Sequence, residues 1–143
     1  MQRSSTSPDD FIASLPEGTR DDIAVLDAQL SRIFERHERV LWEGPMWGGT
    51  EQRIIGYGAY AYEGRSGASG DWFVMGLAAQ KAHLSVYVSA AEDGRYLAKR
   101  YADRLGKVKV GSANITFKRL SDVELPALLE LAERARDLMR QAS

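Results

Sequence analysis

Four polar residues recur at every second position of one otherwise apolar stretch: Lys81, His83, Ser85 and Tyr87. This alternation predicts a β-strand on which the four side chains share one face, with Leu84, Val86 and Val88 on the other. An ammonium group, an imidazole and a phenol on one surface can bind an anionic small molecule through hydrogen bonds. A solvated sheet face has the same pattern, so the binding and the purely structural interpretations both stay open.

A turn earlier in the chain contains Pro45 and Trp47. We expect Trp47 to form an aromatic wall beside the polar strand face, because ligand pockets are lined mainly by apolar and aromatic side chains. The sequence therefore predicts a ligand site at Lys81, His83, Tyr87, Trp47 and Pro45.

Carboxylates are concentrated near the N-terminus, where residues 1–30 contain six Asp and Glu against two Arg, a net charge of −4. Negative charge is favoured at the N-termini of helices, so these carboxylates have a structural explanation. The residues alone predict no resident cofactor.

The stretch from Arg95 to Arg119 has eight Lys and Arg against Asp103 alone, a net charge of +7. Such a patch can contact phosphate groups. The whole chain carries a net charge of only −1, however, which argues against nucleic acid as a partner. A solvated helix face, or a partner for the acidic N-terminal helices, is the competing interpretation.

The chain has 143 residues, of which 44% are hydrophobic, and this size and composition are typical of one globular domain. The absence of cysteine excludes disulfides, thiolate metal sites and cysteine catalysis.

The N-terminus lacks the apolar run of a secretory leader, and no stretch approaches the roughly 20 apolar residues of a membrane span. We therefore expect a cytoplasmic protein without a membrane partner. Whether the chain forms a homodimer is left open.

Capping signals and apolar periodicity predict four helices: one after Ser7, one from Thr19 to Arg39, one from Ser89 to Gly106, and one from about Glu124 with Pro126 in its first turn. The predicted strands are Arg53–Tyr62, Asp71–Ala79, His83–Ser89, Asn114–Lys118 and a shorter Val40–Glu43. The order predicts a single α+β domain, with an antiparallel sheet of four to five strands packed against helices. Residues 1–6 are expected to be a flexible tail, and residues 7–143 the domain.

Five segments stand out in their order and spacing over residues 10–139: Gly44-Pro45-Met46-Trp47, Ile55-Gly56-Tyr57-Gly58, Gly70-Asp71-Trp72-Phe73, Lys81 with Leu84-Ser85-Val86-Tyr87, and Phe117-Lys118-Arg119-Leu120-Ser121-Asp122. Together they resemble the YdhG-like family of small bacterial domains of unknown function. The resemblance implies an α+β fold and carries no catalytic set, although one member is described as a frataxin-like iron chaperone. The chain departs from the family at Gln80, where an arginine is expected, and at Ala113, where cysteine is common.

These observations lead to three functional expectations. The first is a non-enzymatic cytosolic binding module with a small-ligand pocket on the polar sheet face. The second, which depends on the resemblance, is an intracellular iron chaperone that binds Fe(II) weakly through surface carboxylates, since Fe(II) favours carboxylate and imidazole ligands. Its candidate ligands are Asp9, Asp10, Glu17, Asp21 and Asp22. The third is an enzyme of unknown reaction, in which Lys81 or His83 acts as an acid or base.

Overall fold

The computed structural model describes residues 2–45, 51–63 and 69–142. The α-helices are α1 (Pro8–Ala13), α2 (Glu17–Ile33), α3 (Leu97–Tyr101) and α4 (Leu125–Ala142), with 3₁₀ turns at Ala102–Arg104 and Leu120–Asp122. The long strands are β2 (Arg39–Pro45), β3 (Glu51–Glu63), β4 (Ser69–Ala79), β5 (Leu84–Val88) and β9 (Asn114–Phe117). Four two-residue strands complete the fold: β1 (Gln2–Arg3), β6 (Ala91–Glu92), β7 (Arg95–Tyr96) and β8 (Lys109–Val110).

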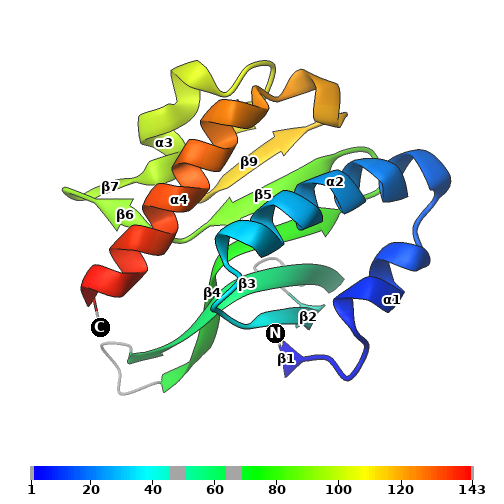
Figure 1. Cartoon of the computed structure of the whole chain (residues 1–143), viewed down its shortest axis with the longest axis horizontal. Helices are drawn as coiled ribbons and strands as arrows, with labels where there is room; N and C mark the ends of the chain where they lie inside the picture. The colour runs from blue at the N-terminus through cyan, green and yellow to red at the C-terminus, as the bar shows by residue number, and fades with distance from the viewer. Residues whose placement is uncertain (1, 46–50, 64–68, 143) are drawn as a thin grey trace.

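Seven strands form one antiparallel sheet in the order β1-β2-β3-β4-β5-β9-β8, and β6 pairs with β7 separately. Helices α2 and α4 cross one side of this sheet (Figure 1). The predicted α+β class, single domain and antiparallel sheet are therefore confirmed. The sheet exceeds the expected four to five strands because two-residue strands extend both edges, and β1 pairs Gln2 and Arg3 with Glu43 and Trp42 where the sequence suggests only a tail.

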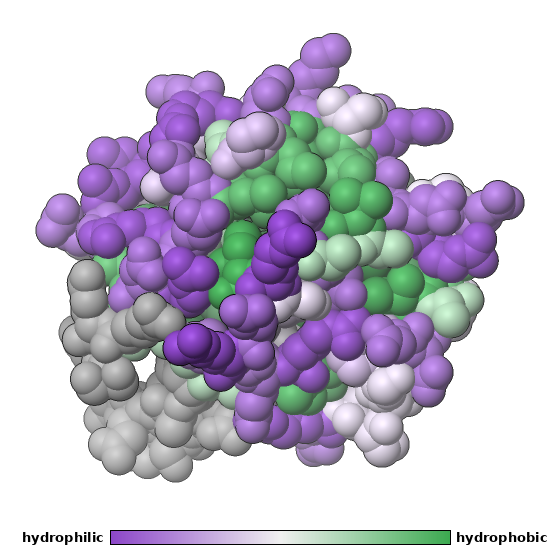
Figure 2. All heavy atoms as spheres, viewed as in Figure 1, coloured by the Kyte–Doolittle hydropathy of each residue, from purple (hydrophilic) through white to green (hydrophobic). Residues whose placement is uncertain are grey.

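The main hydrophobic core lies between the helices and the sheet. Strands contribute residues such as Leu41, Ile55 and Leu77, and the helices contribute Leu30 and Leu128, all fully buried. Viewed from the helical side, the surface is mostly hydrophilic, and hydrophobic side chains reach it in the area between α2 and α4 (Figure 2). No helix in the described residues is long and apolar enough to cross a bilayer.

A second, smaller cluster lies on the opposite side of the sheet, which we call the helix-free face. It consists of Trp42, Ile54, Phe73 and Ala78, with Trp72 and Tyr87 among the residues packed against it. No helical residue in the described ranges belongs to this cluster. The strands therefore position the side chains of this face without a contribution from the described helices.

The helix predicted from Ser89 is wrong over its first half. Residues 91–96 form the β6–β7 hairpin instead, and α3 begins only at Leu97. Asp93 and Gly94 have φ angles of 53° and 78°, as a type I′ turn requires at both central residues. Asp-Gly is a strong signal for this turn, and it outweighs the capping pattern that suggests a helix.

The predicted extent of the second helix is also wrong at both ends. Helix α2 begins at Glu17 rather than Thr19 and ends at Ile33 rather than Arg39. Its C-terminus is fixed from outside, because the Arg136 guanidinium on α4 donates to the Ile33 carbonyl oxygen at 3.2 Å. Arg39 belongs to β2, where it pairs with Tyr57. The first helix after Ser7 and the last helix, with Pro126 in its first turn, agree with the sequence prediction.

Candidate functional site

Four polar side chains are hydrogen-bonded to one another on the helix-free face: Gln52, Gln80, Ser85 and Tyr87. We call them the polar quartet. Gln80 is at its centre, and its Nε2 donates to Gln52 Oε1 at 3.2 Å and to the Tyr87 hydroxyl oxygen at 3.1 Å. Its Oε1 accepts a hydrogen bond from Ser85 Oγ, and Ser85 is only 1% exposed. Side chains from β3 and β5 thereby meet at the amide of the residue that directly follows β4.

The hydrogen bonds of the quartet leave two donor groups unused. Gln80 uses both N–H groups and its oxygen within the quartet, so it serves to position the others. The Tyr87 oxygen accepts from Gln80, and in the described residues its own O–H has no acceptor. The amide nitrogen of Gln52 likewise donates to no described group. Half-buried donors without acceptors are suited to a ligand rich in oxygen acceptors.

The structure does not place the predicted ligand-site residues together on one strand face. Tyr87 lies on the helix-free face, as the alternation predicts. Strand β5 begins at Leu84, however, so Lys81 and His83 lie in the turn before it rather than on the strand. That turn is closed by Gln80 N donating to the His83 carbonyl oxygen at 2.9 Å, and both side chains are exposed. Pro45 is the exposed last residue of β2, and Trp47 lies outside the described residues.

Sequence reasoning missed Gln52 and Gln80 as members of the site. Both continue an alternation that was visible, since Gln52 precedes Ile54 and Gly56 by steps of two, and Gln80 follows Gly76 and Ala78 in the same way. Their cross-strand proximity depends on the β3–β4 register, in which Gly56 faces Gly76. A single sequence does not fix that register.

An aromatic group adjoins the quartet on the same face. The ring centroids of Trp42 and Phe73 are 6.1 Å apart, and those of Trp42 and Trp72 are 6.0 Å apart. The guanidinium carbon of Arg3, on the edge strand β1, is 5.3 Å from the Trp42 ring centroid. Trp42 and Phe73 are 3% and 1% exposed, so Trp72 is the half-buried member of this group.

The five candidate metal ligands are distributed over two helices and have different neighbours. Asp9 Oδ1 pairs with Arg39 at 2.8 Å, Asp21 lies 3.9 Å from Arg20, and Asp22 Oδ2 accepts from the Leu120 backbone N–H at 3.1 Å. Asp10 and Glu17 lie in the first turns of α1 and α2, where negative charge is favourable. Within residues 2–45, 51–63 and 69–142, no group of three or more His, Asp or Glu side chains is arranged to hold a metal ion.

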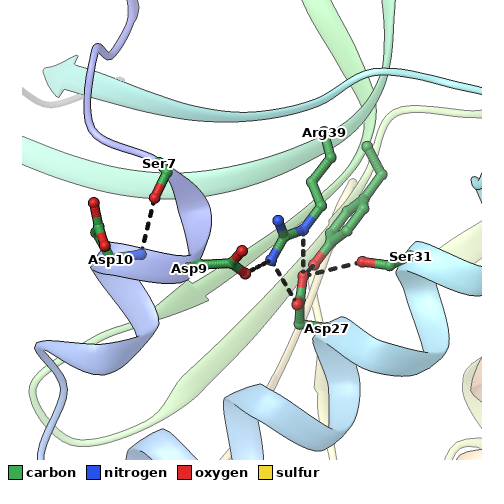
Figure 3. A network of polar contacts seen from close by, with 7 residues as sticks. Ser7, Asp9, Asp10, Asp27, Ser31 and Arg39 are labelled. Carbon is green, nitrogen blue, oxygen red and sulfur yellow. Dashed lines mark hydrogen bonds and ion pairs between the residues drawn. The ribbon is translucent and has the colours of Figure 1, made fainter.

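A buried ionic network joins α1, α2, β2 and β3 on the opposite side of the sheet (Figure 3). Asp27 is its centre: its two carboxylate oxygens accept from Arg39 Nε at 3.0 Å and Nη2 at 2.7 Å. Asp27 Oδ1 also accepts from the Tyr57 hydroxyl at 2.6 Å and from Ser31 Oγ at 3.3 Å. Tyr57 is fully buried and Asp27 is 8% exposed, so these two groups belong to the core, whereas Arg39 and Asp9 lie at its edge.

The environment of this network changes two ionisations. Burial, together with the adjacent Asp27 carboxylate, raises the pKa of Tyr57 well above its ordinary value of 10.0, despite the opposing effect of Arg39. Burial lowers the pKa of Arg39, but hydrogen bonds and charge from Asp27 and Asp9 outweigh it, so that pKa is raised overall. The network therefore keeps Tyr57 neutral and Arg39 charged.

The Tyr57 shift predicts a loss of stability in alkali. Above pH of about 10 an unfolded tyrosine loses its proton while the folded Tyr57 keeps it, so the contribution present below that pH disappears as pH rises toward the folded pKa. The free energy of unfolding should fall by about 1.4 kcal/mol per pH unit more in the wild type than in Tyr57→Phe. Urea titrations of both proteins between pH 9.5 and 11 measure the difference. Equal slopes would contradict the assignment.

The architecture defines the class of protein: a single α+β domain with an open antiparallel sheet, helices on one face and a polar quartet on the other. Comparisons of the chain with family models, with curated proteins and with solved structures each find no match.

Proposed function

We propose that this chain is a YdhG-like, non-enzymatic binding protein of the bacterial cytoplasm that holds a small, oxygen-rich ligand against the helix-free face. The observation that carries the proposal is the unused donor capacity of Tyr87 and Gln52. Gln80 is saturated within the quartet and fixes both neighbours, so the donors are oriented before a ligand arrives. Such preorganisation lowers the cost of binding.

The composition of the quartet favours binding over catalysis. Its members are two amides and two hydroxyls, which hold a ligand through directed hydrogen bonds. The adjacent aromatic group, with Trp72 half-buried, provides the apolar surface that small-molecule sites usually combine with a few polar groups. Lys81 lies in the turn that follows β4, next to Gln80, where it would border the ligand; Pro45 pairs with Glu51, whose side chain faces the helical side, and is not part of this proposal.

A screen of small carboxylates, phosphates and carbonyl compounds by amide-resolved NMR tests this proposal. We expect saturable shifts that centre on Gln52, Gln80 and Tyr87. Tyr87→Phe should weaken the best ligand about tenfold, the equivalent of one hydrogen bond of about 1.4 kcal/mol. Tyr96→Phe is the matched control, because Tyr96 is exposed on the separate β6–β7 hairpin.

Two results would contradict the proposal. One is a set of ligands whose affinity is unchanged by Tyr87→Phe. The other is an anaerobic Fe(II) titration that gives saturable, localised broadening around Asp21 and Asp22, while no small molecule shifts the quartet. That second result would favour the iron-chaperone alternative.

A further inference from the structure

Basic residues from two distant parts of the sequence lie at one end of the sheet. Lys81 and His83 lie in the β4–β5 turn, and Lys118 directly follows β9. Leu84 pairs with Phe117 where β5 begins and β9 ends, so His83 and Lys118, the next residues along the chain, leave the sheet at the same end. Lys109 on β8 faces Thr116, which is two residues before Lys118. Adjacent strands lie about 5 Å apart, so these side chains are within reach of a single small group.

The strand alternation places the neighbouring strand positions on the same face as the quartet. Ile115 and Phe117 belong to the core under the helices, so Thr116, and with it its partner Lys109, has the opposite orientation. Ser85 pairs with Thr116, and Tyr87 pairs with Asn114. Lys81, His83 and Lys118 lie just beyond the ends of these strands, next to the quartet.

The structure separates the basic residues of the chain into paired and unpaired members. Arg100 is 3.3 Å from Glu92 and 3.6 Å from Asp93, and Arg104 pairs with Glu130 on α4. By contrast, the side chains of Lys81, His83, Lys109 and Lys118 have no ion pair or hydrogen bond within the described ranges. Glu51, at the same end of the sheet, alternates with Gln52 and so faces the helical side.

Cations gathered without an acidic partner repel one another, and a bound anion removes that repulsion. A carboxylate carries a single negative charge, whereas a phosphate monoester carries about −1.5 to −2 at pH 7 and offers three acceptor oxygens. Lysine is a common phosphate ligand, acting as a point charge. The charge at this end of the face therefore matches a phosphate better than a carboxylate.

We propose that Lys81, His83 and Lys118 bind the phosphate group of a small phosphorylated compound, with Lys109 at the rim. This inference rests on the proposed function, because the remaining oxygen atoms of the same ligand would accept hydrogen bonds from Tyr87 and Gln52. It adds Lys118 and Lys109 to the site and defines the ligand class as a phosphate monoester.

The test is a titration with inorganic phosphate, and then with glycerol phosphate, followed by amide-resolved NMR at pH 7 and low ionic strength. Both probes should shift the amides of residues 81–85 and 116–118. Lys118→Ala and Lys81→Ala should each weaken phosphate binding about three- to tenfold. Arg32→Ala is the matched control, because it removes one positive charge from the exposed surface of α2 on the helical side and should have no effect.

The outcomes distinguish this inference from the proposed function. An equal loss of affinity in Arg32→Ala and Lys118→Ala would overturn the inference, because only the overall charge would then matter. Absence of phosphate shifts, while other ligands still depend on Tyr87, would overturn the phosphate assignment and leave the quartet as a site. Phosphate binding that depends on Lys118, in a protein whose quartet responds to no ligand, would support the cationic site and refute the proposed function.

Discussion

Asp27→Ala is expected to lower the free energy of unfolding by about 3 kcal/mol, the lower end of the range for removing one partner of a buried ion pair, because Asp27 is buried but the Arg39 side chain is 26% exposed. The carboxylate accepts hydrogen bonds from Arg39, Tyr57 and Ser31, and its replacement leaves the first two with little compensation. Arg39 retains only Asp9, whose side chain is 82% exposed, and the Tyr57 hydroxyl would be fully buried without an acceptor. Urea unfolding at pH 7 measures the change.

Two controls make this prediction specific. Asp21→Ala removes an exposed carboxylate from the same helix and should change stability by about 0.5 kcal/mol or less. Tyr57→Phe, introduced into Asp27→Ala, should be neutral or stabilising, because it removes a hydroxyl that no longer has an acceptor. In the wild-type background the same Tyr57→Phe change should be destabilising. Additive effects of the two substitutions would show that Asp27 and Tyr57 are not coupled.

The Asp27 network also supports the site on the far side of the sheet. Arg39 and Tyr57 are direct cross-strand partners on β2 and β3, and both are bound to Asp27 of α2. The helix therefore fixes the pairing of these two strands and holds Tyr57 on the helical side of the sheet. Because a one-residue slip in register moves every side chain to the other face, this contact keeps Gln52, five residues before Tyr57 on β3, on the helix-free face.

The sequence predicts those parts of the fold whose cause is local. The Ser7 cap of α1 is an example: its hydroxyl accepts from the Asp10 backbone N–H at 3.0 Å, as the spacing suggests. The early end of α2 depends instead on Arg136, 103 residues away, and on the pairing of Arg39 with Tyr57. Neither contact can be recognised from the residues that surround the end of the helix in the sequence.

The candidate site illustrates the same division. Tyr87 could be placed on a polar face because alternation along one strand is local. Gln80 appeared in the sequence only as a departure from a family pattern, yet it is the residue that connects Gln52, Ser85 and Tyr87. Its role depends on three strands meeting in one register. The gathering of Lys81 with Lys118 depends in the same way on β5 pairing with β9.

Gly76→Ala is expected to cost about 2–3 kcal/mol of unfolding free energy, although it adds a single methyl group. A Cβ atom at this position would lie 2.6 Å from Phe73 Cε1 and 2.7 Å from Ile54 Cγ2. Gly56, which faces Gly76 across β3 and β4, is equally confined, with Trp42 Nε1 at 2.5 Å. A buried ring held on both sides cannot move a few tenths of an ångström without displacing its neighbours, so Gly56→Ala should have a similar effect. Urea unfolding of both variants provides the measurement.

Gly18→Ala is the matched control for these substitutions, because the same methyl group has nothing within 4 Å and falls in the first turn of α2. It should stabilise the protein by about 0.5–1 kcal/mol, the helix preference of alanine over glycine.

Gly76 also pairs with Tyr87, and Phe73 lies against Trp72 with ring centroids 4.3 Å apart. Gly76→Ala should therefore weaken ligand binding at the quartet as well as stability, whereas Gly18→Ala should change stability alone. Normal ligand binding in a destabilised Gly76→Ala protein would show that the aromatic group supports the sheet without shaping the site.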